Sequence, residues 1–321
     1  SMMGNHLSGS GMNLTLRQLR YIVSVADHGS IAAAARVCSI SQSSVLAAMA
    51  QAEHVMAARL FDKRPARGVM PTPAGERFIA SARRFLVAEA DFSRTIQGQA
   101  NGMPAVLRIG CFAPFGALFM PDLLRRFMAG SEAEVQLMEG EQPQLLAWLE
   151  SGTVDAVVTY DVGTMLPADR IELALVPPHA LLPAEDPLAR QSAVSLAELA
   201  ARPLVLLDLP QTSSYLTSLF DAAGVRPRVA FRTRNYDTVR AAVASGFGMS
   251  ILNMRPFGMG SPDSPSLIRR PLTDPVGALR VIVADKYGPE KPAFLRQFVA
   301  TAKAYFDHIG PQGYALAWES P

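Results

Sequence analysis

This 321-residue chain lacks several features that mark secreted and membrane proteins. It has only two cysteines, Cys38 and Cys111, which are too few for a disulfide framework and are typical of a reducing cytoplasm. No apolar run reaches the roughly 18 residues that a membrane-spanning helix needs. The N-terminus has no basic segment followed by an apolar one, so we expect no secretion signal. The sequence therefore predicts a cytoplasmic protein with no membrane partner.

The chain also lacks the residue patterns of a metal site or a catalytic centre. Its five histidines are scattered, and no pair has the spacing of metal ligands. No Gly-x-Ser-x-Gly turn occurs, and no Ser-His-Asp set can be assigned. The segment 246–248 lacks the third glycine of a dinucleotide-binding motif. We therefore expect no enzyme, no metal and no cofactor. We interpret Cys111 as a structural thiol, with a redox sensor as the alternative.

The chain does contain material for more than one packed core. Apolar residues make up 49% of it and charged residues 18%, and a single core rarely grows beyond about 250–300 residues. The net charge of +2 is unevenly divided, with +5 in residues 1–100 and −3 in residues 101–321. A basic N-terminal part suits phosphate binding, although an imbalance of this size is common. Residues 1–13 are expected to be disordered or a remnant of cloning.

Two short helices that meet at a tight turn are predicted between residues 30 and 51. Ser30 and Ser41 are suited to cap them, and the small side chains of Ala34 and Ala35 allow a close helix crossing. A further helix over residues 15–28 precedes them. This is the pattern of a helix-turn-helix, which presents the N-terminal end of its second helix to the DNA major groove.

The residues expected to contact DNA lie in this motif and in a basic turn that follows it. The amide of Gln42 can pair with adenine, and a neighbouring hydroxyl can reach a base or a phosphate. In the turn, between two short predicted strands, an arginine can enter the minor groove. The alternative is that these residues form solvated surfaces. The candidates are Arg36, Ser41, Gln42, Ser43, Ser44, Arg64 and Arg67.

From residue 104 onward, predicted strands and helices alternate, which indicates parallel sheets with helices on both faces. Connections near 176–182 and 270–276 divide this region into two lobes around a cleft. The strands are expected at Val106–Gly110, Glu134–Glu139, Asp155–Thr159, Leu204–Leu207, Val229–Thr233, Met249–Leu252 and Leu279–Val283. Lobe 1 is predicted to hold residues 104–178 and 276–309, lobe 2 residues 179–275, and 310–321 a loose tail.

A ligand is expected in the cleft, because ligands of doubly wound folds bind beyond the carboxyl ends of the strands. Residues 111–114 are predicted to form a loop after the first strand. Three hydroxyls and free amides at a predicted helix start, residues 212–214, suit a carboxylate, although an ordinary cap needs only one hydroxyl. The candidates are Phe112, Ala113, Pro114, Tyr160, Asp161, Thr212, Ser213, Ser214, Asn235, Tyr236 and Asn253.

These motifs resemble those of LysR-type transcriptional regulators. The similarity is carried in the family's order and spacing by Leu16–Tyr21, Gly29–Ser30, Ala34–Ala35, Ser41–Gln42, Leu60–Phe61 and Thr72–Gly75, and further on by Asp155–Asp161 and Gly246–Leu252. The resemblance implies a winged helix-turn-helix over 14–72 and a linker helix over 73–100 that pairs two subunits. It also implies an α/β effector domain over 104–309, with two Rossmann-like lobes like those of type 2 periplasmic binding proteins.

The resemblance further implies a ligand-responsive regulator that binds double-stranded promoter DNA as a homodimer or tetramer. A small-molecule effector, which we expect to be an organic acid, and RNA polymerase would be its other partners. This chain departs from the family pattern at two places. Family members often carry Arg, Lys or Gln in the stretch where this chain has Leu-Ala-Ala-Met-Ala at residues 46–50, and they often carry Pro at the position of Ser43. The alternatives are a solute-binding protein with the same two-lobed fold, against which the helix-turn-helix argues, and an α/β enzyme.

Overall fold

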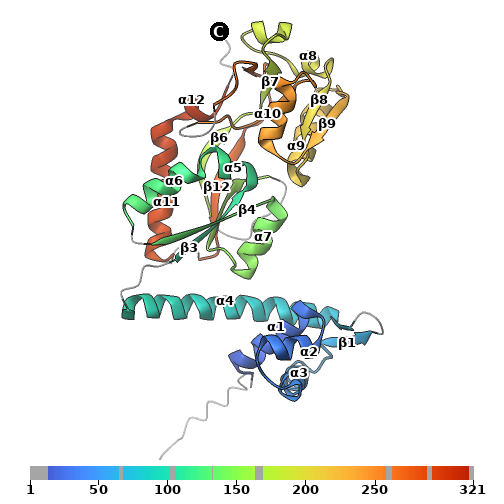
Figure 1. The fold of residues 1–321 in the computed structure, drawn as a ribbon, viewed down its shortest axis with the longest axis vertical. Helices are drawn as coiled ribbons and strands as arrows, with labels where there is room; N and C mark the ends of the chain where they lie inside the picture. Colours follow the sequence, from blue (N-terminus) through green and yellow to red (C-terminus); the bar gives the residue numbers. More distant parts are fainter. Residues whose placement is uncertain are drawn as a thin grey trace, which may run out of the picture. The chain divides into compact units, whose positions relative to one another are not determined.

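The computed structural model describes most of the chain, which divides into two compact units (Figure 1). The units are Ser1–Gly102 and Met103–Pro321. The described residues are 14–64, 68–101, 106–131, 133–162, 169–257, 262–287 and 291–317. The expectations for residues 1–13 and for Arg67 lie outside them. Within the described part, no single helix is long and apolar enough to cross a membrane, although Ile31–Val37 and Gln42–Met56 pass that test together as a bent pair.

The N-terminal unit is a winged helix-turn-helix followed by a long helix. Its elements are α1 (Leu16–His28), α2 (Ile31–Val37), α3 (Gln42–Met56), the antiparallel strands β1 (Phe61–Arg64) and β2 (Gly68–Pro71), and α4 (Pro73–Asn101). The expected caps are confirmed, because the hydroxyls of Ser30 and Ser41 accept hydrogen bonds from the amides of the first turns of α2 and α3. Gly29 ends α1 with a left-handed φ of 60°.

A close backbone contact fixes the wing, β1 and β2, to the start of α4. A Cβ atom on Gly75 would lie 1.9 Å from the carbonyl oxygen of Leu60, so only glycine fits there. The amide of Thr72 donates to the same carbonyl at 2.9 Å. On the other side, the carboxylate of Glu53 in α3 accepts the amide of Leu60 at 2.8 Å. Leu60 therefore joins α3, the wing and α4, and its side chain is fully buried.

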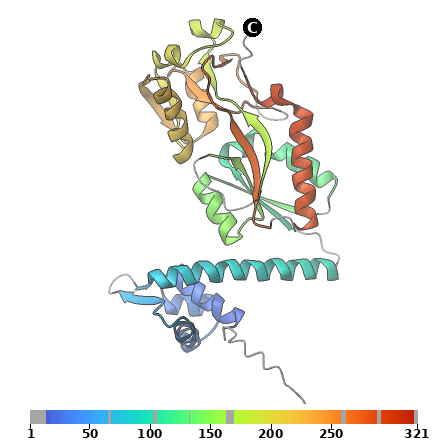
Figure 2. The same cartoon turned by 180° about the vertical axis from the view of Figure 1, so that it is seen from behind.

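Lobe 1 of the C-terminal unit is a five-stranded sheet with helices on both faces. Its strand order is β4-β3-β5-β12-β6. The elements are β3 (Val106–Phe112), α5 (Ala113–Leu118), α6 (Met120–Ala129), β4 (Glu134–Gly140), α7 (Gln142–Ser151), β5 (Ala156–Tyr160), β6 (Asp169–Val176), β12 (Leu279–Asp285) and α11 (Ala293–Ile309). Figure 2 shows α11 along one side of the sheet and α7 along the other.

Lobe 2 is built around β7, which pairs with β10 and β11, and around the parallel pair β8 and β9. A bridge between Leu204 and Met249 joins the two groups of strands. The elements are β7 (His179–Pro183), the 3-10 helix η1 (Pro187–Arg190), α8 (Leu196–Ala200), β8 (Leu204–Leu207), α9 (Pro210–Ala222), β9 (Val229–Thr233), α10 (Tyr236–Ala244), β10 (Ser250–Leu252) and β11 (Leu267–Pro271).

The sheets are mixed, so the expectation of parallel sheets is correct for some strand pairs and wrong for others. β3 pairs in parallel with β4 and β5, but β12 runs antiparallel to β5 and β6. β7 is likewise antiparallel to both of its neighbours. The segments predicted as connections, 176–182 and 270–276, contain ends of β6, β7 and β11, because the chain passes between the lobes with few intervening residues.

The tail is also different from the expectation of a loose segment. Residues 311–314 form a short helix, α12 (Pro311–Tyr314). The Tyr314 side chain is 4% exposed, and its ring lies 5.3 Å from that of Phe306 in α11. The guanidinium of Arg255 donates to the carbonyls of Gln312 and Gly313. An aromatic side chain and a paired arginine therefore dock this segment, whereas residues 318–321 lie outside the described part.

Candidate functional sites

The start of α3 carries one exposed amide side chain, Gln42, and three serines that bond to one another. Gln42 is the first residue of the helix, and it is exposed together with the three serines around it. The hydroxyls of Ser43 and Ser44 each lie 2.8 Å from the hydroxyl of Ser41. These serines therefore hydrogen-bond within the cap, which leaves the Gln42 amide as the long polar group of this turn.

The basic candidates surround the helix-turn-helix. Arg36 is exposed near the end of α2. In the wing, Arg64 is the last residue of β1 and pairs in register with Gly68, so the backbone places it beside the turn of the hairpin. Arg67 falls within that turn in the sequence but outside the described residues. The position of Arg64 is consistent with the expected basic wing tip.

Sequence reasoning missed an apolar surface on α3. Leu46 is 45% exposed, and Ala47 and Ala50 are exposed as well. Beside them a cavity of about 570 Å³ opens between α3 and the wing. Its lining residues are Ile31, Leu46, Met49, Ala50, Glu53, Arg59, Phe61, Asp62 and Val69. The helix thus carries hydrophobic side chains on a face that the N-terminal unit does not cover.

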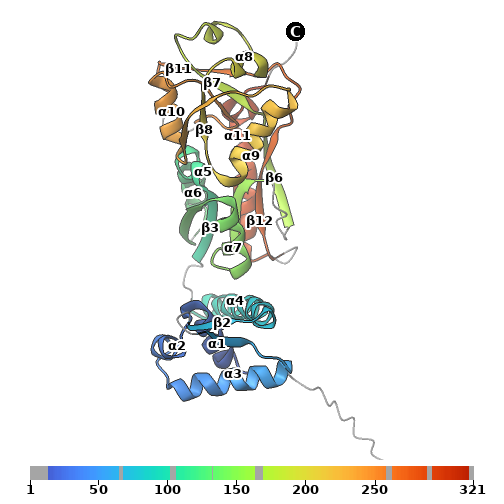
Figure 3. The ribbon, with the colours of Figure 1, turned by 90° about the vertical axis from the view of Figure 1, so that its right-hand side faces the viewer.

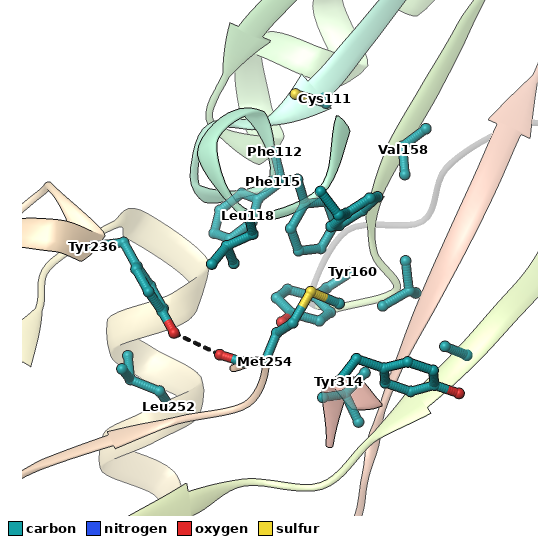
Figure 4. Close-up of a cluster of buried hydrophobic side chains, with 14 of the residues drawn as sticks. Cys111, Phe112, Phe115, Leu118, Val158, Tyr160, Tyr236, Leu252, Met254 and Tyr314 are labelled. Carbon is teal, nitrogen blue, oxygen red and sulfur yellow. Dashed lines mark hydrogen bonds between the residues drawn. The ribbon is translucent and has the colours of Figure 1, made fainter. Parts of the chain in front are cut away.

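In the C-terminal unit, several ligand candidates are buried in an aromatic cluster between the lobes (Figure 4). The Phe112 ring lies 5.4 Å from Phe115 and 5.6 Å from Tyr160. Residues 111–114 do not form the expected loop, because β3 runs to Phe112 and α5 starts at the next residue. Phe112 and Pro114 are consequently buried, and Ala113 is partly buried.

Cys111 belongs to the same buried region. It lies in β3, is fully buried, and appears beside this cluster in Figure 4. Burial and, to a smaller extent, the carboxylate of Glu139 raise the pKa of the Cys111 thiol to about 12. A thiol that stays protonated at neutral pH reacts poorly with oxidants. This environment favours the structural interpretation of Cys111 over the redox sensor.

Three tyrosines converge near the segment that follows β10. The Tyr236 hydroxyl donates to the Met254 carbonyl at 2.6 Å, as drawn in Figure 4. Asn253 donates to the Tyr215 hydroxyl at 3.0 Å and to the Val176 carbonyl in lobe 1 at 2.9 Å. Burial raises the pKa of Tyr160 well above its usual range, and the phenols of Tyr236 and Tyr215 add to this effect. The three phenols therefore remain neutral and can act as donors.

The start of α9 differs from the predicted carboxylate cradle. The helix begins at Pro210, so residues 212–214 already lie within its first turns. The hydroxyls of Ser213 and Ser214 donate back to the Pro210 carbonyl, at 3.4 and 3.3 Å. In this structure both hydroxyls are directed at a backbone carbonyl, and their part in binding a carboxylate stays a prediction. Thr212 is only 9% exposed.

Two other candidates have local structural partners. Asn235 caps α10, with its side-chain oxygen accepting the Thr238 amide at 2.9 Å. Asp161 forms an ion pair with Arg170 at 2.9 Å. These contacts explain why polar residues occur there without requiring a ligand. Sequence reasoning missed Gln211, whose buried Oε1 has no hydrogen-bond partner among the described residues, and Tyr215, which lies one turn further along α9.

A buried polar network in lobe 2 was also missed. Arg269 of β11 donates to Nε2 of His179 at 2.6 Å and to the Tyr236 hydroxyl at 3.2 Å. Its guanidinium also pairs with Asp263, which in turn accepts a hydrogen bond from Arg240 at 2.9 Å. His179 sits directly after the passage between the lobes, where the sequence analysis expected a connection. The network joins β7, β11 and α10, and a single sequence offers no local signal for it.

The two units define a class of protein: a winged helix-turn-helix joined to a two-lobed α/β unit. Residues 16–76 match the family "Bacterial regulatory helix-turn-helix protein, lysR family", and residues 100–307 match the "LysR substrate binding domain". The chain belongs to the LysR family of bacterial transcriptional regulators. It is therefore a regulator with a DNA-binding domain and an effector-binding domain.

Individual relatives agree with this assignment. The chain is 28% identical over 290 residues to the transcriptional activator protein LysR of Escherichia coli K12, covering 83% of this chain and 90% of that protein. It is 31% identical to the crystal structure of HinK, a LysR family regulator from Pseudomonas aeruginosa, with a TM-score of 0.58 over 91% of this chain and 98% of that one. The CbnR regulator, solved with its target DNA, shares the fold at 21% identity and a TM-score of 0.62, over 91% of this chain and 100% of its own.

Proposed function

We propose that the exposed start of α3 enters the major groove of promoter DNA while the wing contacts the adjacent minor groove. The observation that carries this proposal is the exposed Gln42 at the N-terminal end of α3, where the helix dipole favours an approach to phosphates. Arg36 and Arg64 are the basic residues that would neutralise the backbone. The solved CbnR complex with its target DNA supports the same use of the fold.

Binding of the full-length chain to duplex DNA as a function of salt tests this proposal. Each neutralised phosphate should contribute a slope of about −0.9 to the logarithm of the binding constant against the logarithm of salt concentration. A sequence-specific site should be enriched from a library of randomised duplexes. Failure to bind any duplex at low salt would contradict the proposal.

We also propose that α4 pairs two copies of the chain. Phe85 and Phe92 are 56% and 68% exposed on this helix, although its neighbours Phe78 and Ile79 are buried in the N-terminal unit. Phe85 and Phe92 are seven residues apart, so they lie on one helical face. Two large exposed aromatic side chains on one face are typical of a protein–protein contact. Light scattering of the full-length chain would measure the expected dimer or tetramer.

The effector proposal concerns the junction of the two lobes in the C-terminal unit. The first-turn amides of α9, from Gln211 and Thr212, precede the first intrahelical bond, which Ser213 makes to Leu209 at 2.8 Å. Such amides suit the carboxylate of a small organic acid. Gln211 Oε1, which has no hydrogen-bond partner within the described part of the chain, adds an acceptor, and the Tyr215 hydroxyl adds a donor. An acceptor and a donor at these positions could bind a hydroxyl or an amine group on the same acid.

The lobes are linked by contacts that a ligand can rearrange. Asn253 of lobe 2 bonds to Val176 of lobe 1, and Arg234 pairs with Glu141 at the start of α7. An effector that prefers one arrangement of these contacts shifts the population towards it. We propose that this shift changes how the paired subunits hold promoter DNA and how RNA polymerase gains access to it.

A thermal-shift screen of small organic acids against the full-length chain tests the effector proposal, followed by calorimetry on any acid that binds. The variant Tyr215→Phe removes one phenol donor, and Ser218→Ala is its matched control because the exposed Ser218 hydroxyl donates to the backbone carbonyl of Tyr215 within α9. Loss of one neutral hydrogen bond should weaken binding by about 0.5–1.5 kcal/mol. Equal affinities of both variants and the parent would contradict a site at Tyr215.

A further inference from the structure

The exposed face of α3 contains no charged side chain in its first three turns. The residues from Gln42 to Ala52 include no Asp, Glu, Lys or Arg. Val45, Ala48 and Ala52 point into the core of the N-terminal unit and are at most 1% exposed. The opposite face carries Gln42 and Ser43 and then three apolar residues, Leu46, Ala47 and Ala50, all of which are exposed.

This apolar face is left uncovered by the rest of the N-terminal unit. Figure 3 shows α3 along the outer edge of the N-terminal unit, with the other helices of that unit on one side of it. Leu46 and Ala50 also line the cavity of about 570 Å³ between α3 and the wing. Leu46 is 45% exposed, so contact with an apolar surface would remove part of its side chain from water and contribute free energy to binding.

Within the major groove, the apolar feature of a base pair is the 5-methyl group of thymine, which alanine and other apolar side chains can contact. Gln42, Leu46 and Ala50 are spaced by four residues and span about 12 Å along the helix. That length covers about three to four base-pair steps of about 3.4 Å. The Ser43 and Ser44 hydroxyls, which bond to Ser41, compete poorly for bases.

We infer that Leu46, Ala47 and Ala50 form a reading surface for thymine methyl groups, so that the DNA site is recognised partly by apolar contact. Gln42 would read a neighbouring base by hydrogen bonding at the start of the helix. The inference rests on the proposed docking of α3 in the major groove.

The test begins with a duplex that the full-length chain selects from a randomised library. Each thymine of this duplex is replaced in turn by deoxyuridine, which removes only the methyl group and leaves base pairing intact. Because one buried methyl group contributes about 0.8 kcal/mol, each contacted thymine should lose about fourfold in affinity. Thymines outside the contacted positions should show no loss.

The variant Leu46→Ala assigns the contact to its side chain. With this variant, the deoxyuridine effect should fall below about twofold at the thymine that Leu46 touches, as a double-mutant cycle requires for interacting groups. Val55→Ala is the matched control, because Val55 is a 36% exposed apolar residue at the far end of α3. Its deoxyuridine effects should equal those of the parent chain.

The outcomes separate this inference from the proposal on which it rests. Sequence-specific binding that is unchanged by deoxyuridine at every thymine would overturn methyl reading and leave major-groove binding intact. A deoxyuridine effect that persists unchanged in Leu46→Ala would overturn the role of Leu46. Absence of any salt-dependent duplex binding would overturn both the proposed function and the inference.

Discussion

Lowering the pH from 7.5 to 5.5 should destabilise the C-terminal unit through one histidine. Burial, with a smaller contribution from the adjacent Arg269, holds the pKa of His179 well below its usual value. In the unfolded chain the same histidine has a pKa of about 6.5. Below that pH the unfolded state binds a proton that the native state does not bind. Acid therefore favours unfolding, and stability rises with pH across this window.

The expected loss of unfolding free energy follows from the protonation of His179 in the native and the unfolded chain. Protonation of an unfolded histidine is negligible at pH 7.5 and stabilises the unfolded state by about 1.4 kcal/mol at pH 5.5. Burial would raise the pKa of Asp186 and Asp263, but arginine partners outweigh it and lower both. Their contribution is lost only as the pH falls through about 4 and below, so it does not enter this window.

Urea denaturation of the full-length chain, followed by tryptophan fluorescence, measures this effect. Trp148 lies in α7 of the C-terminal unit, and the sequence of the N-terminal unit contains no tryptophan, so the signal reports unfolding of the C-terminal unit. The variant His179→Gln retains an acceptor for Arg269 but does not titrate. It should be less stable than the parent at pH 7.5 and should lack the drop of about 1.4 kcal/mol at pH 5.5. An equal drop in both proteins would refute the reasoning.

Three further predictions concern the proposed DNA contacts and subunit pairing. Gln42→Ala should cost about 1–3 kcal/mol on the selected duplex and little on random DNA, measured by fluorescence anisotropy; equal losses would mean a backbone contact. Arg67→Ala should weaken binding to all duplexes and reduce the salt slope by about one unit in a titration series. Phe92→Ser, at a position that is 68% exposed, should lower the mass found by light scattering while circular dichroism still shows a folded chain; an unchanged mass would argue against pairing through α4.

The elements that the sequence predicts best are those whose ends are determined locally. α2 and α3 begin after Ser30 and Ser41, because a serine hydroxyl accepts the amides left free at a helix start. β8 and β9 are observed at the predicted residues. In these cases the signal lies within a few residues of the boundary, so no tertiary information is needed.

The elements that were missed depend on partners far away in the sequence. β6 pairs with β12, more than 100 residues later, and α12 is docked by Arg255 and by the ring of Phe306. The mixed order of the sheets has the same origin, because the direction of β12 is set by the route of the chain through lobe 2. Local periodicity carries no information about such pairings.

The proposed sites also depend on contacts that the local sequence does not show. Ser213 and Ser214 carry donors that suit a carboxylate, but both hydroxyls donate to a carbonyl one turn earlier, which is visible only in the folded structure. Leu46 was also missed, because the sequence does not separate it from the other apolar residues of α3; only the structure shows that Val45, Ala48 and Ala52 form the buried face and leave Leu46 outside it. Consistency between pattern and burial is the rule in a folded domain, and departures from it concentrate at functional surfaces. An apolar residue that breaks the pattern on a recognition helix is therefore a better guide to specificity than the hydroxyls beside it.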